Sequence, residues 1–227
     1  RYFTMCGRYV FFTPDEYEEY REILRRIAKS LKAGIGILDK PENPHPGGEI
    51  FPGTFAPVIP SVDFAENNLD KTDLPVQRMY WGFPLDPKAS KRVINARSET
   101  VESKYMFRKC LDKKRLIVPA KGFYEWKTEE NKKKTKTLIR VSGQEAIYMA
   151  GLYDEFELPG HGKILCFTIL TVDASPQVAS IHNRMPALLE ERHLELWLND
   201  RIFARYRSML NKILVPYQGN LEILPTG

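Results

Sequence analysis

The sequence contains few cysteines and histidines, and their spacing excludes several kinds of site. Its 227 residues include three cysteines, which lie far apart, and four histidines. An odd number of separated cysteines argues against a disulfide framework and favours a reducing, cytoplasmic compartment. No C-x-x-C pair or H-x-x-x-H spacing supports a metal site, and no Gly-rich phosphate loop occurs. We therefore expect neither a metal nor another cofactor.

Long apolar runs and internal repeats are also absent. No run approaches the roughly 18–20 apolar residues that cross a membrane, and the opening residues do not resemble a signal peptide. We see no convincing linker, so we expect one domain over residues 5–227 and a monomer with no membrane contact. Residues 1–4 precede Met5, and we interpret them as a remnant of expression or an unprocessed leader.

The residues that are present suit a folded, basic protein. Hydrophobic residues make up 43% of the chain and aromatic residues 11%, which is enough for a sizeable core. The net charge is +5, and residues 88–121 hold eleven Lys or Arg against three acidic residues. This segment is either a solvated charged face or the electrostatic footprint of a polyanion, most plausibly nucleic acid. The charge pattern alone leaves both interpretations open.

Short strands outnumber helices in the pattern, which predicts an α+β fold with a mainly antiparallel, barrel-like sheet and peripheral helices. The expected strands are 9–12, 51–59, 76–83, 92–94, 116–120, 122–127, 137–141, 147–153, 164–171 and 221–224. Prolines within 51–59 favour an edge or bent strand over a central one. A helix should begin after Thr13, with Pro14 in its first turn, and end at Gly34. Further helical patterns cover 99–110, 175–180, 189–199 and 199–212.

Met5-Cys6 permits a special chemistry near the N-terminus. Removal of Met5 would leave Cys6 with an α-amine, of pKa about 7.7–8.0, and a thiol, of pKa about 8.5, on one residue. Both groups are then partly deprotonated and nucleophilic near neutral pH. An aldehyde can form a Schiff base with the amine and then be captured by the sulfur as a five-membered thiazolidine. An internal cysteine cannot do this, so any residues before Cys6 must first be cleaved.

Polar residues within apolar segments are further candidates, each with a structural alternative. Glu125 lies between Tyr124 and Trp126, where desolvation would suit acid/base chemistry, or it faces solvent and pairs with a lysine. His182 lies in a loop before a proline turn, although a lone histidine is more often structural. Asn95 and Arg97 follow a predicted strand, where Asn can orient an amine and Arg can clamp a phosphate. Cys110, at a predicted helix end, and Cys166, within an apolar strand, are expected to be structural residues.

Four ordered motifs together resemble the SOS response-associated peptidase family, the abasic-site-processing proteins. They are Cys-Gly-Arg-Tyr at 6–9, Asn-Ala-Arg-Ser-Glu at 95–99, Gly-Phe-Tyr-Glu-Trp at 122–126 and His-Asn-Arg-Met-Pro at 182–186. Each motif alone is weak, but four in order are specific, and the resemblance runs from Met5 to about Leu198. It implies one β-rich α+β domain that binds single-stranded and junction DNA and joins Cys6 covalently to abasic sites. It also implies self-cleavage before Cys6, hence a peptidase, with lyase-like activity.

The resemblance assigns roles only to residues that match its motifs. Cys6 matches the crosslinking nucleophile, Asn95 the residue that holds its amino end, and Glu125 and His182 the acid/base residues. The residues that match DNA-contacting positions are Arg8, Pro57, Trp81, Arg97, Thr171 and Arg184. Among these, Arg8 and Arg97 would contact phosphates and Thr171 would lie near the lesion. Trp81 and Pro57 would form an apolar wedge that separates bases or caps the end of the duplex. The polar loop at 61–75 resembles an insertion.

Two other functions remain as alternatives. The first is a thiol peptidase or N-terminal-nucleophile amidohydrolase that uses Cys6 with Glu125 and His182 on other substrates. The second is a non-covalent DNA-binding module in which Cys6 is structural. Formation of a heat-stable adduct with abasic DNA would separate covalent capture from both.

Overall fold

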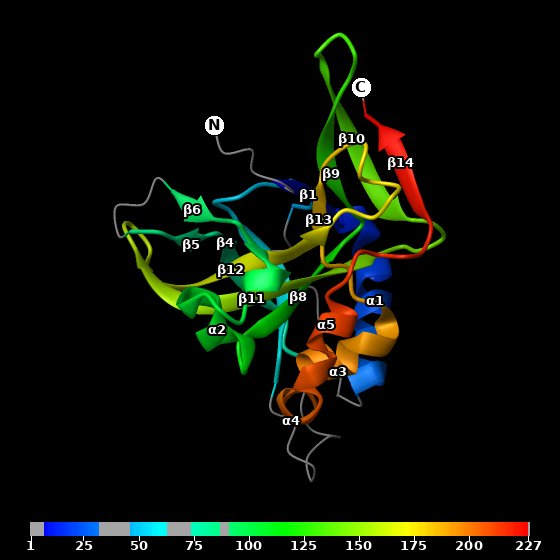
Figure 1. Cartoon of the computed structure of the whole chain (residues 1–227). Helices are drawn as coiled ribbons and strands as arrows, with labels where there is room; N and C mark the ends of the chain where they lie inside the picture. The colour runs from blue at the N-terminus through cyan, green and yellow to red at the C-terminus, as the bar shows by residue number, and fades with distance from the viewer. Residues whose placement is uncertain (1–6, 32–45, 63–73, 87–90, 227) are drawn as a thin grey trace.

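A computed structural model of the chain describes residues 7–31, 46–62, 74–86 and 91–226 (Figure 1). Its strands are β1 (Arg8–Phe11), β2 (Gly48–Ile50), β3 (Phe55–Pro60), β4 (Gln77–Trp81), β5 (Phe83–Pro84), β6 (Arg92–Val93), β7 (Asn95–Arg97), β8 (Arg115–Ala120), β9 (Gly122–Thr128), β10 (Lys134–Val141), β11 (Ile147–Leu158), β12 (Gly162–Asp173), β13 (Arg184–Pro186) and β14 (Leu221–Pro225). Its helices are α1 (Tyr17–Leu31), α2 (Tyr105–Leu111), α3 (Leu194–Leu198), α4 (Asp200–Arg205) and α5 (Leu210–Ile213), with 3₁₀ turns η1 (Pro14–Glu16), η3 (Ser98–Thr100), η4 (Glu191–His193) and η5 (Arg207–Met209).

Five strands close into a barrel. The strands pair in the order β11, β8, β3, β4 and β12, and β12 returns to β11. The middle of β12 is buried continuously from Cys166 to Val172, because β12 has neighbours on both edges and packed side chains on both faces. β7 adds to one edge of β12 in parallel, and β13 to the other edge in antiparallel orientation. The predicted barrel-like, mainly antiparallel fold is confirmed.

The proline-containing strand β3 lies in the barrel wall between β4 and β8, so of the two expected positions, edge or bent strand, the edge position is wrong. Its first four residues, Phe55–Val58, pair with β4, and its last two residues pair with β8. Each of these two parts therefore needs ladder bonds on only one side. This switch of partner explains how Pro57 and Pro60 are tolerated in a strand that has two neighbours.

A second sheet of five strands, in the order β14, β10, β9, β1 and β2, packs against the barrel. Tyr9 of β1 is fully buried, and its ring lies 5.1 Å from that of Trp81 on β4. Trp81 in turn stacks on Phe167 of β12, with ring centroids 6.0 Å apart. This aromatic column joins the two sheets through one core. Beyond it, the β9–β10 hairpin projects from the body of the molecule (Figure 1).

The helices cover the outside of the two sheets. In the first helical region the backbone N–H of Thr13 donates to the Glu16 side chain at 2.9 Å, and η1 leads directly into α1. Leu31 ends α1, and the predicted stop at Gly34 lies outside the described residues. Residues 175–180 form hydrogen-bonded turns rather than the predicted helix, and the long pattern near 99–110 divides into η3 and α2. None of the described helices has the length and apolar content that crossing a bilayer requires.

Candidate functional site

The N-terminal motif enters the second sheet directly after Cys6, which lies outside the described residues. Arg8 opens β1 opposite Tyr124 of β9, so Gly7 precedes the strand at the point where β9 continues to Glu125. The guanidinium of Arg8 lies 3.4 Å from the Glu49 carboxylate and stacks over Phe51 and Trp126, at 4.6 and 5.0 Å from their ring centroids. Arg8 is therefore held beside aromatic side chains while remaining partly exposed.

Glu125 is a buried carboxylate in the middle of β9. It is 4% exposed and pairs across the ladder with Thr137 of β10. Strand alternation places Glu125 on the inward face with Phe123, and Tyr124 and Trp126 on the opposite face. The exposed-strand alternative therefore does not hold. A buried carboxylate is costly unless it is hydrogen-bonded or has a chemical role.

Asn95, Arg97 and Thr171 lie together on two parallel strands. In the β7–β12 pairing Asn95 is opposite Ile169, and Arg97 is opposite Thr171. Arg97 is exposed and Asn95 is half-buried, whereas Thr171 is 1% exposed. The Thr171 hydroxyl donates to the Ala96 carbonyl at 3.4 Å. Asn95 and Arg97 thus share one face of a short strand that Thr171 helps to fix.

Arg184 is the first residue of β13, which pairs with β12. Its guanidinium group forms hydrogen bonds with other residues of the protein. Its Nη1 and Nη2 donate to the two oxygens of Glu99, each at 2.8 Å, in a bidentate pair. The same guanidinium donates to the Asp173 carboxylate at 2.6 Å and to the Thr171 carbonyl at 2.8 Å. Although burial alone would raise the pKa of Glu99, the hydrogen bonds and charge of Arg184 lower it overall. Arg184 therefore joins β12, β13 and η3.

His182 is oriented by the backbone of Arg184. The Arg184 N–H donates to His182 Nδ1 at 3.1 Å, so the neutral ring carries its proton on Nε2. Partial burial lowers the pKa of His182, and the positive charges of Arg184 and Lys134 act in the same direction. His182 is thus a neutral hydrogen-bond donor through Nε2 at pH 7. It can accept a proton at Nδ1 only by giving up the bond from Arg184.

The structure brings the predicted residues into two groups. Asn95, Arg97 and Thr171 lie on β7 and β12, where they join Arg184 and His182, while Arg8 and Glu125 lie on β1 and β9. The charge of Lys134 at the start of β10 is one of the causes of the lowered pKa of His182. Sequence reasoning overlooked Glu99 and Asp173 as the partners of Arg184. Glu99 closes the Asn-Ala-Arg-Ser-Glu motif, and that position was the available signal.

Trp81 and Pro57 are core residues in this structure. Trp81 is fully buried, and its indole N–H donates to the Ile94 carbonyl at 3.0 Å. Pro57 is buried within β3. Neither ring presents a free face to a base, which is what an apolar wedge would require. Both residues belong to the barrel wall, Trp81 on β4 and Pro57 on β3.

Several cations of the basic segment 88–121 are paired with carboxylates of the protein. Lys109 and Lys114 both pair with Asp154, and Lys121 pairs with Glu16. Arg115 is fully buried, pairs with Asp200 at 2.5 Å and donates to the Trp197 carbonyl at 2.7 Å. At least these four cations are paired within the protein. The charge excess of the segment therefore overstates the number of unpaired cations available to a polyanion.

The remaining described cysteines are unsuited to nucleophilic chemistry. Cys110 and Cys166 are both buried and free, as the sequence predicted. Burial raises the pKa of each thiol to about 12, so thiolate is scarce at neutral pH. Within the described residues, no group of three or more His, Cys, Asp or Glu side chains is placed to hold a metal ion.

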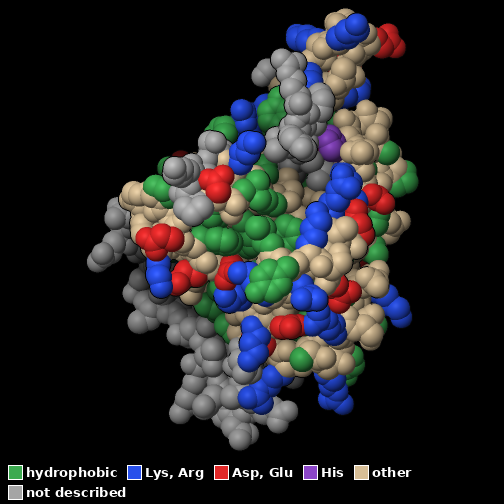
Figure 2. Space-filling model, turned by 60° about the vertical axis from the view of Figure 1, so that its left-hand side comes forward, with side chains coloured by type: hydrophobic (Ala, Val, Ile, Leu, Met, Phe, Trp, Pro, Cys, Tyr) green, Lys and Arg blue, Asp and Glu red, His purple; other side chains and the backbone are tan. Residues whose placement is uncertain are grey.

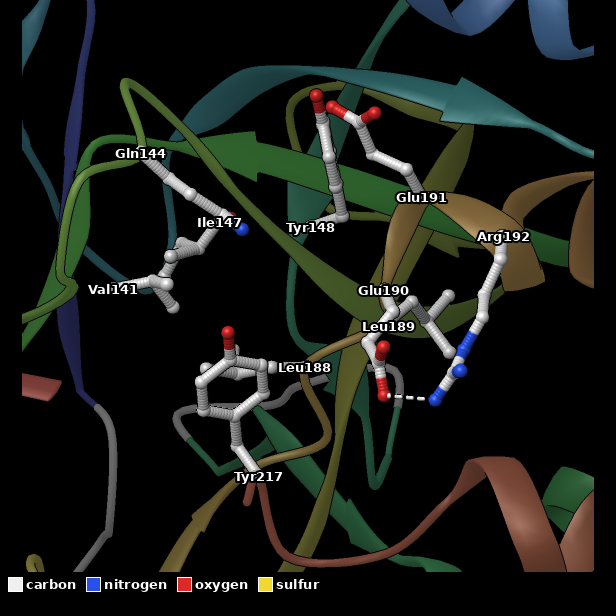
Figure 3. A pocket seen from close by; sticks show the side chains of 10 residues that line it. All are labelled: Val141, Gln144, Ile147, Tyr148, Leu188, Leu189, Glu190, Glu191, Arg192 and Tyr217. Carbon is white, nitrogen blue, oxygen red and sulfur yellow. Dashed lines mark hydrogen bonds and ion pairs between the residues drawn. The ribbon is translucent and has the colours of Figure 1, made fainter. Parts of the chain in front are cut away.

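A cavity of about 270 Å³ opens elsewhere on the molecule, between the β10–β11 turn, the segment 188–192 and Tyr217 (Figure 3). None of the predicted site residues lines it. Burial raises the pKa of Tyr148 at its wall to about 12, with a further contribution from nearby Glu191. Glu190 and Arg192 pair with each other at 2.9 Å across its rim. None of the residues that line the cavity belongs to the four motifs.

Comparison with known proteins identifies the family. Residues 5–226 match the profile of the SOS response associated peptidase (SRAP) family. The chain belongs to this family. It is 30% identical over 222 residues to the abasic site processing protein YoqW of Bacillus subtilis (strain 168), which covers 95% of this chain and 89% of that protein. It is 32% identical to YobE of the same organism, an abasic site processing protein, over 95% of this chain and 91% of YobE.

The SRAP match extends to animals and to solved structures. The chain is 34% identical over 175 residues to the abasic site processing protein HMCES of Gallus gallus, covering 65% of this chain and 52% of that protein. A crystal structure of a Bacteroides thetaiotaomicron protein has a TM-score of 0.71 and 23% identity, covering 98% of this chain and 92% of that one. This similarity supports the fold. The profile match and the Bacillus subtilis relatives confirm the family resemblance that the four motifs indicate.

Proposed function

We propose that this SRAP protein acts on abasic sites in single-stranded DNA and captures them covalently through Cys6. The observation that carries the proposal is the position of Gly7, which follows Cys6 directly and lies where β9 reaches the buried carboxylate of Glu125. The names of the relatives, abasic site processing proteins, give the substrate class. Arg8 and Arg97 supply partly or fully exposed guanidinium groups for phosphates.

The covalent step balances without a cofactor. Cleavage before Cys6 frees its α-amine, which adds to the aldehyde of the ring-opened deoxyribose to give a carbinolamine. Loss of one water gives the Schiff base, and the Cys6 thiol then adds across the C=N bond while its proton passes to nitrogen. A general acid assists the loss of water. We assign this proton transfer to Glu125, with Asn95 holding the amino end and His182 donating through Nε2 to the sugar.

The proposed cleavage of the Met5–Cys6 bond would make the protein an autopeptidase. The same nucleophile that captures the lesion is generated by this step, so the two activities share Cys6. The thiol peptidase alternative differs because it predicts hydrolysis of added peptides. The non-covalent alternative predicts binding without an adduct.

The test compares three proteins that begin at residue 6, with Cys6, Cys6→Ser or Cys6→Ala. Each is mixed with an oligonucleotide bearing one abasic site and run on a denaturing gel. We expect a heat-stable band only with Cys6. Cys6→Ser and Cys6→Ala retain the amine, so they should give a band only after borohydride reduction of the Schiff base. No adduct with Cys6 at saturating DNA would refute covalent capture, and cleavage of an added peptide would favour the peptidase.

A further inference from the structure

The β9–β10 hairpin forms a two-stranded arm beyond the body of the second sheet. β1 pairs with β9 only over Gly122–Tyr124, and β14 pairs with β10 only over Thr137–Val141. Past these points the two strands pair with each other as far as Thr128 and Lys134. The N–H and the hydroxyl of Thr226 both donate to the Lys136 carbonyl. The arm therefore projects as a ribbon, as Figure 1 shows.

The tip of the arm is an ordered turn. The N–H of Glu129 donates to the Lys133 carbonyl, and the N–H of Lys132 donates to the Glu129 carbonyl, each at 2.9 Å. The Asn131 side chain accepts from the Lys133 N–H at 2.9 Å. Lys132 adopts a left-handed conformation, with φ of 65°. These bonds fix the direction in which the backbone presents its side chains.

The arm carries an excess of positive charge. Residues 127–136 contain five lysines and two glutamates. Lys127 pairs with Glu129 at 3.4 Å, and Lys136 pairs with Glu49 near the base of the arm. Lys132 and Lys133 are exposed, and no carboxylate among the described residues forms an ion pair with either. Lys and Arg side chains are conspicuous at this projecting end in Figure 2.

The arm begins at the proposed reaction site. Glu125 and Thr137 face each other at its base. At roughly 3.3 Å per residue, Thr128 lies about 10 Å along β9 from Glu125, with Lys132 and Lys133 beyond it. A DNA strand whose abasic site reaches Glu125 thus has its flanking phosphates within reach of the tip.

We propose that the lysines at the tip of the β9–β10 arm bind the phosphate backbone of the single strand flanking the abasic site. This inference rests on the proposed function for the identity of the ligand. The arm adds affinity and a longer footprint, while the chemistry remains at Cys6 and Glu125. Its contribution is electrostatic and independent of base sequence.

The test replaces Lys132 and Lys133 with Gln and compares this variant with Lys29→Gln/Lys212→Gln. The control also removes two exposed lysines, from α1 and α5, on the side of the molecule away from the arm (Figure 1). Binding is measured by fluorescence anisotropy over a range of salt concentrations. The probes carry tetrahydrofuran, an abasic analogue without an aldehyde, in a long oligonucleotide or in a short one spanning only the lesion and its nearest neighbours.

We expect the arm variant to bind the long oligonucleotide about tenfold more weakly at moderate salt, and its log–log salt slope to fall by about 1.4, or ~0.7 per lost phosphate contact. The short oligonucleotide and the control variant should show no comparable change. An unchanged slope, or an equal loss with the short probe, would overturn the arm proposal. Adduct yield with true abasic DNA at saturation tests Cys6 separately, and it should be unaffected by the arm variant.

Discussion

Glu125 illustrates, at the scale of single residues, how burial gives a common side chain an unusual position. Glu125 is 4% exposed. Its neighbours in sequence, Tyr124 and Trp126, point to the opposite face of the strand. The position of this buried carboxylate beside the N-terminal motif favours a chemical role. The sequence could suggest this role from the motif but not from the alternation pattern.

We predict that Glu125→Gln slows adduct formation by about 100-fold, because an amide cannot transfer a proton in place of the carboxyl group. Affinity for an oligonucleotide carrying the tetrahydrofuran analogue should stay within about twofold, since Gln preserves the shape of Glu. Rates come from gel-resolved time courses and affinities from anisotropy. Thr137→Val, which changes the buried residue opposite Glu125, is the control. If Thr137→Val slowed adduct formation equally, the rate would depend on packing around residue 125 and not on its proton, and Glu125 would be structural.

His182 should make the stability of the protein depend on pH. Because its folded pKa lies below the ordinary value, the unfolded chain binds more protons between the folded and unfolded pKa values. Its contribution is therefore fully present above about pH 6.5 and is lost as pH falls through the folded pKa. We predict that His182→Gln flattens the loss of unfolding free energy on acidification in this window, measured by urea denaturation.

His193 provides a check on the sign of this effect. Burial also lowers the pKa of His193, so His193→Gln should flatten the profile in the same direction. The double variant should be the flattest of the three. A steeper acid loss in His182→Gln than in the unmodified protein would contradict the placement of a neutral His182 beside Arg184.

At the scale of elements, Arg184 shows how one side chain fixes several short segments. β7, β13 and η3 contain three residues each, too few to hold their positions by backbone pairing alone. The bidentate pair with Glu99 and the bond to the Thr171 carbonyl join them into one unit. Asn95, Arg97 and His182 all lie on or next to this unit. Its rigidity therefore sets the geometry of one half of the site.

We predict that Arg184→Lys lowers the free energy of unfolding by about 2 kcal/mol, because an ammonium group cannot reproduce the planar fork that satisfies Glu99 and Thr171. A role limited to phosphate binding would leave stability nearly unchanged, since Lys keeps the charge. Urea denaturation measures the difference. Asp173→Asn is the control, since Asp173 also contacts Arg184 but its side chain is 83% exposed, and it should cost well under 1 kcal/mol.

At the scale of the whole molecule, closure of the barrel depends on close contact between β11 and its neighbours. β11 pairs with β8 on one edge and β12 on the other. At Gly151, an added Cβ would lie 2.8 Å from the Thr168 carbonyl oxygen and 2.6 Å from Cδ1 of Leu116. The backbone at this point has no room for a side chain. Gly151 is thus required by packing, not by an unusual backbone conformation.

We predict that Gly151→Ala destabilises the protein by about 1–3 kcal/mol, because the strands must move apart to admit the methyl group. Thermal and urea unfolding measure the loss. Gly160→Ala at the β11–β12 turn is a suitable comparison, since its φ of 78° imposes strain while nothing lies within 4 Å of the added Cβ. A smaller loss at Gly151 than at Gly160 would mean that the barrel adjusts readily at that seam.

Much of the fold was predictable because strand and turn signals are local. The hairpins at 122–141 and 147–171 and the terminal strand at 221–224 follow from β-branched and aromatic runs separated by turn residues. The sequence failed where the outcome depends on distant partners. Residues 175–180 have a helical pattern but form turns, and β3 contains prolines but is paired on both sides by switching neighbours.

The sequence by itself determined the family, the barrel-like class of the fold and the set of motifs, because these depend on residue type and order along the chain. Only the tertiary structure decided which charged and aromatic side chains are buried and which face solvent. Arg184 binds Glu99, 85 residues away, and Arg115 binds Asp200. Trp81 packs between Tyr9 and Phe167. Burial and pairing arise when distant segments meet, and desolvation makes each buried charge take a partner. Lys132 and Lys133 at the tip of the β9–β10 arm remain exposed because the ribbon extends beyond its neighbouring strands.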